Sequence, residues 1–372
     1  MTQLSNTLTY AASGVDYDLL DAFKRECQAA ASGTVGALAA LGLSEPKAVR
    51  GDSAYLVETA DSFIAHVEEG LGTKNLVADA VLEKTGVSHY RAIAIDLVAT
   101  IVNDLITSGA RPAVVAMHAA VGDATWFAHA KRRQDLAAGF AEGCRLAGAV
   151  WGGGETPALK GLVSDGAIVL GGSAIGLIQP KARRITGDIQ DGDAILLVAS
   201  NGVHANGLTL CRRIAESLPA GYQTPITPDG PSYGEGLLAP SVIYAPLIAA
   251  CQDAALPIHY AIHVTGHGWR KLMRAEANMV YRVTDPGKPP PLFRYLMKAG
   301  PIAEKEAWGT FNMGVGFALI MPKGAAQVAI GLAQQNGMRA WIGGVVAEEG
   351  GRKAVEIPSL GIAWEADALA VR

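Results

Sequence analysis

The sequence predicts an α/β protein of two domains. The chain has 372 residues, and a domain usually takes about 100–200 residues, so two domains are expected. Half of the residues are hydrophobic and 18% are charged, as in a folded protein with a large interior. The 44 glycines, many of them at the junctions of apolar runs, are typical of tight strand-to-helix turns.

Charge and cysteine content exclude several classes of protein. The net charge is −4 with acids and bases well mixed, so no basic field exists to hold nucleic acid or an anionic membrane. The four cysteines lie far apart without CxxC spacing and are expected to be reduced thiols. No stretch approaches the about 20 apolar residues that a membrane helix needs, and the first residues do not resemble a signal peptide. We therefore expect a cytoplasmic protein that binds neither nucleic acid nor membrane.

The first elements are predicted from their apolar patterns. Residues 1–50 are helical in character, with breaks at Gly and Ala. Residues 54–58 (AYLVE) and 63–69 (FIAHVEE) are predicted strands, because both are apolar and rich in β-forming residues. After the loop EEGLGTKN, a helix is predicted over about 75–85.

The next elements alternate in the same way. Residues 90–96 (YRAIAID) are a predicted strand, running into the segment LVATIVNDLITSGARP, which we expect to be helical. The apolar run at 113–121 is a further strand, and a helix follows at about 134–148. This alternation of strands and helices is what an α/β domain requires.

One helix face in LVATIVNDLITSGARP has an unusual composition. A broad apolar face leaves a narrow stripe made of Asp96, Thr100, Asn103 and Thr107, with Asp104 at its border. A water-facing stripe usually carries Lys, Glu or Arg, whereas these short groups suit a ligand or a metal better. The alternative is an ordinary amphipathic helix with Asp96 as its N-cap.

Two glycine-rich loops place acids next to flexible backbone. EEGLGTKN carries Glu69 and Lys74, and it is either a ligand loop or a solvated surface turn. WGGGETPALKG has three consecutive glycines, which permit close approach of the backbone and would hold Glu155 at the mouth of a turn. The alternative for the second loop is a plain connection with a solvated acid.

A polar and charged segment at 179–193 separates two apolar halves, and we place the domain boundary there, giving domains 1–182 and 183–372. The second half opens with the strand AILLVAS, the loop NGVHANG and the helix LTLCRRIAESL. A strand, a Gly-rich loop and a helix N-terminus together form an anion site, and here the loop carries His204 and Asn206. IHYAIHVTGHGWRKLMR is a second such unit, and GTFNMGVGFALIMP is a loop leading into a buried strand.

Common motifs are missing from the sequence. It has no GxxxxGK[ST], no early GxGxxG, no HExxH and no GxSxG. The lone His267 in VTGHG is not a convincing metal ligand. A protein of this sequence that handles phosphate must use another arrangement.

Seven segments together resemble the aminoimidazole ribonucleotide synthetase (phosphoribosylformylglycinamidine cyclo-ligase) family. They are YAASGVD, EEGLGTKN, AIDLVATIVNDLITSGARP, CRLAGAVWGGGETP, SNGVHANGLTL, HVTGHG and TFNMGVG. The family's versions read approximately YKDAGVD, TDGVGTK, GIDLVAMxVNDLxxxGAxP, GCxLxGGETAEMPG, SSGxHSNGYSL, HITGGG and TFNMGVG. The order and the separations agree, and the resemblance covers most of the chain.

The resemblance implies a two-domain fold and a reaction. The N-terminal α/β domain (1–182) would pair with its copy to build a β-barrel across a homodimer, and residues 183–372 would form an α/β sandwich domain on the substrate side. The implied reaction is ATP-dependent ring closure of formylglycinamidine ribonucleotide in purine biosynthesis, with Mg²⁺. ATP phosphorylates the formyl-amide oxygen, which makes it a good leaving group when nitrogen attacks.

The resemblance also implies the site residues. Those for Mg²⁺ are Glu69, Asp104, Glu155 and Asp52, the last because RGDSAY resembles the GDDAA stretch of the wider superfamily, although Asp52 could simply end a turn. Those for ATP are Gly70, Gly72, Thr73, Lys74, Asp96, Asn103, Gly153 and Gly154. Those for catalysis are Lys74, His204 and Asn206. Those for the substrate side of the cleft are Thr265, Gly266, Gly268 and Asn312.

Several departures from the family pattern fall near the expected site. Ala11 and Ala12 replace a lysine and an aspartate, Glu69 replaces an aspartate, Pro157 stands in an altered loop that has lost an acid, and His267 replaces a glycine. They leave two alternatives open. One is a relative that uses the same ATP and Mg²⁺ activation on another amide, carboxyl or phosphate substrate. The other is a non-catalytic nucleotide-binding relative.

Overall fold

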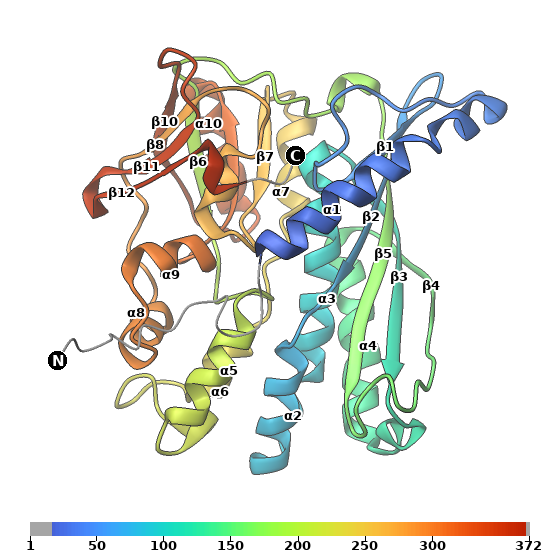
Figure 1. Cartoon of the computed structure of the whole chain (residues 1–372), viewed down its shortest axis with the longest axis vertical. Helices are drawn as coiled ribbons and strands as arrows, with labels where there is room; N and C mark the ends of the chain where they lie inside the picture. Colours follow the sequence, from blue (N-terminus) through green and yellow to red (C-terminus); the bar gives the residue numbers. More distant parts are fainter. Residues whose placement is uncertain (1–16, 370–372) are drawn as a thin grey trace.

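The chain forms two α/β units, each built around one sheet, in a computed structural model that describes residues 17–369 (Figure 1). This confirms the predicted two-domain α/β class. The segment YAASGVD, with Ala11 and Ala12, lies outside the described residues. None of the helices within 17–369 has the length and apolar character required to span a bilayer.

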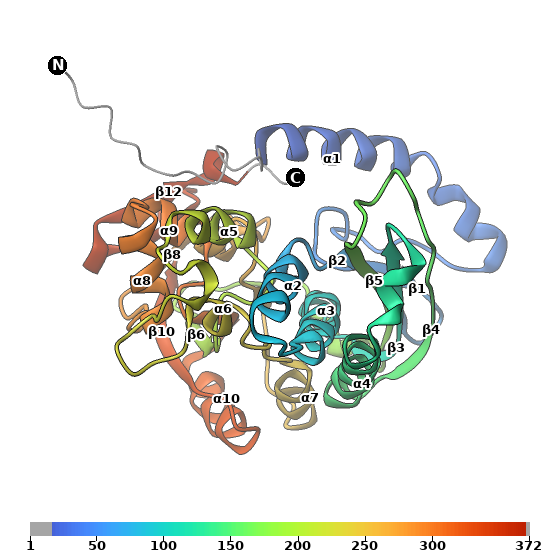
Figure 2. The same ribbon diagram turned by 90° about the horizontal axis from the view of Figure 1, so that it is seen from below.

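The N-terminal unit is a five-stranded sheet in the order β1-β2-β5-β3-β4, with only β3 and β4 parallel. Its elements are α1 (Tyr17–Ser32), β1 (Tyr55–Glu58), β2 (Phe63–Gly70), α2 (Lys74–Thr85), α3 (Tyr90–Leu105), β3 (Arg111–Val121), α4 (Ala130–Ala147), β4 (Val150–Glu155) and β5 (Ile168–Ile178). Helices α2, α3 and α4 lie on one side of this sheet (Figure 2). The predicted strands 54–58, 63–69 and 113–121 and the helices at 75–85 and 134–148 are confirmed.

The predicted strand at 90–96 is wrong, because these residues form the first part of α3. Ile93, Ala94, Leu97 and Val98 are all buried, so this part of α3 is a short apolar run inside the protein, and such a run does not distinguish a buried helix from a strand. Helix α4 packs closely on α3 because Gly139 has no side chain. A Cβ at this position would lie only 2.2 Å from the Arg91 carbonyl oxygen.

Within residues 17–369, none of the helices α2, α3 and α4 covers the other face of this sheet (Figure 2). On β5, Leu170 and Ala174 point into the core, whereas Val169, Ile175 and Leu177 are exposed. This alternation follows from the period of two along a strand. The result is an apolar sheet face open to solvent in the single chain.

The segment WGGGE forms β4, an exposed strand at the sheet edge, rather than the predicted glycine turn. It pairs in parallel with β3, where Val114 lies opposite Val150 and His118 opposite Glu155. The glycines therefore serve an extended strand, and Glu155 stands at the exposed end of that strand.

The C-terminal unit is a seven-stranded sheet in the order β12-β11-β8-β10-β6-β9-β7. Its elements are β6 (Ala194–Ala199), α5 (Leu208–Ser217), α6 (Tyr233–Leu237), α7 (Ala245–Asp253), β7 (Tyr260–His263), β8 (Val280–Val283), α8 (Pro291–Ala299), α9 (Glu304–Thr310), β9 (Val315–Met321), α10 (Lys323–Gln335), β10 (Ala340–Ala347), β11 (Ala354–Ile357) and β12 (Ile362–Glu365). The predicted strand–loop–helix at 194–218 is confirmed. In the second such unit a 3₁₀ helix, Gly268–Met273, follows the loop.

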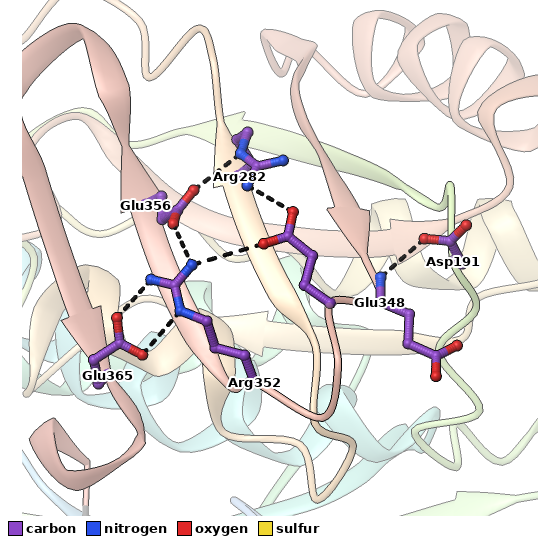
Figure 3. Close-up of polar contacts among 7 residues, drawn as sticks. Asp191, Arg282, Glu348, Arg352, Glu356 and Glu365 are labelled. Carbon is purple, nitrogen blue, oxygen red and sulfur yellow. Dashed lines mark hydrogen bonds and ion pairs between the residues drawn. The ribbon is translucent and has the colours of Figure 1, made fainter.

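Ion pairs tie the outer strands of this sheet together (Figure 3). Arg352 contacts Glu356 at 2.6 Å and Glu365 at 2.5 Å, and Arg282 on β8 contacts Glu356 at 2.9 Å. These surface charges link the segment before β11 to β8, β11 and β12.

Candidate functional site

A cavity of about 590 Å³ lies between the two domains. Of the residues expected at the site, it brings together Asp52, Glu69, Gly70, Asp104, Asn206, Thr265 and Gly266. It is also lined by Thr100 of the predicted polar stripe, and by residues to which the sequence assigned no role: Phe23, Lys24, Cys27, Gln28, Gly51, Ser53, Ala205, His263, His267, Lys271, Arg274 and Leu369. The cavity thus draws on both units and on α1.

Carboxylates line the N-terminal side of the cavity. Burial, and then the charge of Asp104, raises the pKa of Glu69 to about 7. Burial alone would raise the pKa of Asp104, but the charge of Lys271 and a 2.7 Å contact with His263 Nδ1 outweigh it and lower that pKa. Asp52 accepts a 3.4 Å hydrogen bond from Tyr260. Within residues 17–369 no three His, Cys, Asp or Glu side chains stand together as a ready metal site.

Glu155 does not line this cavity, contrary to its predicted place beside the other metal ligands. It lies with Gly153 and Gly154 around a separate hollow, next to Met117 and Trp151. The reason is that β4 runs as an extended edge strand beside β3, which carries Glu155 and both glycines to the outer face.

Lys74 is not placed to face phosphates as predicted. It begins α2, its side chain is fully buried, and its Nζ lies 2.7 Å from Asp96 Oδ2 on α3 and 2.9 Å from the Ala239 carbonyl oxygen. Burial lowers the pKa of Lys74 and raises that of Asp96, and their pairing opposes both shifts. The remaining Asp96 oxygen accepts a 2.8 Å hydrogen bond from the Ser241 amide.

The polar stripe on α3 therefore divides into two parts. Asn103 donates to the Val242 carbonyl oxygen at 2.8 Å and accepts from the Tyr244 amide at 2.9 Å, so it binds C-terminal backbone just as Asp96 does. Thr100 and Asp104 instead line the cavity. Half of the stripe joins the two domains and half faces the space where a ligand fits.

The predicted site residues in the loops of the C-terminal unit also fall into two groups, those that line the cavity and those that are buried away from it. Asn206 and Thr265 line the cavity, whereas Asn312 is buried and accepts a 2.9 Å hydrogen bond from the Ser200 hydroxyl group. His204 is buried, and burial lowers its pKa well below the usual value. Gly268 has φ +53°, and a Cβ there would lie 2.4 Å from the Trp308 carbonyl oxygen, so it shapes the loop.

Of the other residues of the predicted ATP loop, Gly70 lines the cavity and Gly72 and Thr73 do not. Gly72 adopts φ +74°, and the Thr73 hydroxyl group is 3.5 Å from that of Thr209 on α5. This loop therefore spans the two units where β2 ends and α2 begins.

Helix α1 covers the cavity, running from the C-terminal unit toward β1 and β2 (Figures 1 and 2). His267, in the left-handed conformation at φ +67°, points its Nε2 at Asp21 Oδ2 of α1, 3.1 Å away. Burial lowers the pKa of His267 to about 4. No motif in the sequence of α1 signals this role, but the unusual histidine in VTGHG does.

Two family models together match about four-fifths of the chain. The family described as "AIR synthase related protein, N-terminal domain" matches residues 50–178, and its C-terminal counterpart matches residues 190–356. A phosphoribosylformylglycinamidine cyclo-ligase of Sorangium cellulosum is 36% identical over 366 residues, covering 92% of this chain and 97% of the relative. One of Synechococcus sp. (strain CC9902) is 33% identical over 350 residues, covering 91% and 95%.

Solved structures share the fold at low sequence identity. AaThiL complexed with AMPPCP and TMP has a TM-score of 0.60 at 12% identity, covering 97% of this chain and 100% of that chain. The hydrogenase maturation protein HypE in complex with ATP has a TM-score of 0.58 at 18% identity, covering 81% and 84%.

Proposed function

Because the chain belongs to the AIR synthase related protein family, we propose that it is an ATP-dependent cyclo-ligase. It closes formylglycinamidine ribonucleotide to aminoimidazole ribonucleotide and releases ADP and phosphate. The observation that carries this proposal is the identity of 33–36% to cyclo-ligases over more than nine-tenths of the chain. The cavity between the domains supports it, because it holds the expected polar residues of both units.

In this reaction the protein acts mainly by positioning the reactants and by stabilising the charge on the transferred phosphoryl group. An amide oxygen is a poor leaving group, and its phosphorylation by ATP makes it a good one. Asn206 and Thr265 present neutral hydrogen-bonding groups to the cavity, where they orient the substrate amide. In this proposal residues 1–182 bind ATP and residues 183–372 bind the substrate.

Glu69, Asp104 and Asp52 are the groups proposed to hold Mg²⁺, which would neutralise the charge of the transferred phosphoryl group. The charge of Asp104 raises the pKa of Glu69, so the two carboxylates repel one another and a divalent cation would relieve this repulsion. Mg²⁺ commonly uses one or two carboxylates together with water and phosphate oxygens, so Glu155 is not required.

The exposed face of the N-terminal sheet supports a homodimer. Val169, Ile175 and Leu177 on β5 and Val150 on β4 are exposed apolar side chains on this face, whereas Trp151 packs against Phe140 of α4 on the other face. A second copy packed on the exposed face would bury its apolar side chains and close the two sheets into a barrel. Sedimentation of the wild type as a dimer and of Ile175→Glu as a folded monomer would support this assembly, and a monomeric wild type would contradict it.

Growth of a purine auxotroph that lacks its cyclo-ligase provides the cellular test. Expression of this chain should restore growth without added purine, and a Glu69→Gln/Asp104→Asn variant produced at the same level should not. Failure of the folded wild type to restore growth would count against the proposed substrate.

A further inference from the structure

Two cations that line the cavity make no direct ion-pair contact with a carboxylate among the described residues. Among residues 17–369, neither Lys271 nor Arg274 forms an ion pair, whereas Lys24 on the same cavity is paired with Asp21 at 2.9 Å. An unpaired cation taken out of water is costly, so it persists where a function or a ligand requires it.

Lys271 is held by a neutral group. It lies in the 3₁₀ helix after the VTGHG loop, is 9% exposed, and donates a hydrogen bond to the Thr265 hydroxyl group. An ammonium has three N–H donors, and within the described part of the chain this is the one acceptor that Lys271 has. Two donors are therefore available to a ligand in the cavity.

The charges around Lys271 come from several elements. Burial lowers its pKa to about 8, against the charge of Asp104 on α3. Arg274 and Lys24 also lower that pKa, and Glu69 on β2 raises it. At neutral pH the side chain is still mainly the ammonium.

Arg274 is also fixed by neutral groups. Its Nε and Nη2 donate to the Gly51 carbonyl oxygen at 3.1 and 2.8 Å, and its Nη1 donates to the Ser53 hydroxyl group at 2.9 Å. These bonds hold the planar guanidinium in one orientation at the cavity wall. A guanidinium has five N–H donors, so two remain for a ligand.

We propose that Lys271 and Arg274 form a phosphate subsite in the cavity between the domains. An immobilised guanidinium and a buried ammonium both bind phosphate oxygens through charge-assisted hydrogen bonds. The subsite extends the proposed function, since the phosphate belongs either to the ribonucleotide substrate or to ATP. Glu69 and Asp104 line the same cavity, where burial acts to raise the pKa of both carboxylates and the charges of Lys271 and Arg274 act to lower it.

The test combines kinetics with direct binding. Lys271→Met should raise the KM for one phosphate-bearing ligand by about 10- to 100-fold, as expected for loss of a charge-assisted hydrogen bond. A rise for formylglycinamidine ribonucleotide assigns the subsite to the substrate phosphate, and a rise for ATP assigns it to the nucleotide. Lys271→Arg should keep most of the affinity. Lys298→Met, at an exposed position on α8, is the matched control and should leave both KM values unchanged.

Calorimetry with ribose 5-phosphate and with a non-hydrolysable ATP analogue separates this proposal from the proposed function, because neither titration needs turnover. Loss of binding in Lys271→Met would support the subsite even in a protein that closes no ring. A protein that closes the ring, but whose Lys271→Met and Arg274→Gln variants keep wild-type KM and binding values, would overturn the subsite alone.

Thermal unfolding excludes a purely structural role. Lys271→Met removes the cost of burying an ammonium and also its attraction to Asp104 and Glu69, so these two effects offset one another and the unfolding temperature should change by no more than about 2–4 °C. A variant that loses more stability than this, together with affinity, would show that Lys271 holds the fold, and would overturn the proposal.

Discussion

Replacing Lys74 by methionine tests whether this lysine is part of the protein core. The Lys74–Asp96 pair is fully buried with a 2.7 Å contact, so Lys74→Met leaves an uncompensated carboxylate in the interior. Breaking a buried pair by removal of one partner costs about 3–5 kcal/mol. The substitution also removes the hydrogen bond that Lys74 donates to the Ala239 carbonyl oxygen. We therefore expect the free energy of unfolding to fall by about 4 kcal/mol, a large part of the about 5–15 kcal/mol that a folded protein has.

Urea unfolding followed by tryptophan fluorescence measures this change, since the chain has six tryptophans. Lys84→Met makes the same substitution at an exposed position of α2 and should change the free energy by less than about 0.5 kcal/mol. Lys74→Met/Asp96→Asn should recover most of the loss, because the neutral amide still accepts from the Ser241 amide.

The alternative outcome is equally clear. A Lys74→Met protein with wild-type unfolding free energy but no ATP binding would refute the core role. That result would instead support the contact between Lys74 and the ATP phosphates that the family resemblance implies.

Further predictions concern the cavity. The pKa of His267 is about 4 in the fold and about 6.5 when unfolded, so the unfolded chain takes up the proton first and stability falls as pH drops from 6.5 to 4. The difference corresponds to about 3 kcal/mol. Glycine readily adopts φ +67°, so His267→Gly tests this. Its free energy of unfolding should depend less on pH between 6.5 and 4 than that of the wild type, and an unchanged pH dependence would contradict the pKa given for His267. Mg²⁺ should raise the melting temperature of the wild type but not of Glu69→Gln; an equal rise in both would remove Glu69 from the metal site. Gly268→Ala should lower that temperature by several degrees, because its Cβ meets the Trp308 carbonyl oxygen at 2.4 Å, and an unaffected variant would contradict this packing.

The polar stripe on α3 shows which features of the site helical periodicity predicts and which it does not. It identifies Asp96 and Asn103 as functionally placed, and the structure agrees that they do not face solvent. Besides the Lys74 ammonium that pairs with Asp96, their partners are the backbone at Ser241, Val242 and Tyr244, about 140 residues later in the chain. No local pattern distinguishes a stripe that binds backbone from one that binds a ligand.

Long-range pairing also explains why only one of the two glycine-rich segments lies at the cavity. Composition identifies Glu69 and Glu155 equally well as acids beside flexible backbone. Sheet pairing then decides between them, since β2 ends at the cavity whereas β4 is an edge strand on the outer face. Helix α1 lines the cavity without any sequence motif, because its contact depends on His267 reaching Asp21 across more than 240 residues of chain.

Phosphate release from Mg·ATP, measured with and without formylglycinamidine ribonucleotide, tests the proposed reaction most directly. We expect release that depends on this ribonucleotide and matches the amount of aminoimidazole ribonucleotide formed. Intact ATP binding without any stimulation by this substrate would contradict the cyclo-ligase assignment and would indicate that the same ATP machinery acts on another amide or acid.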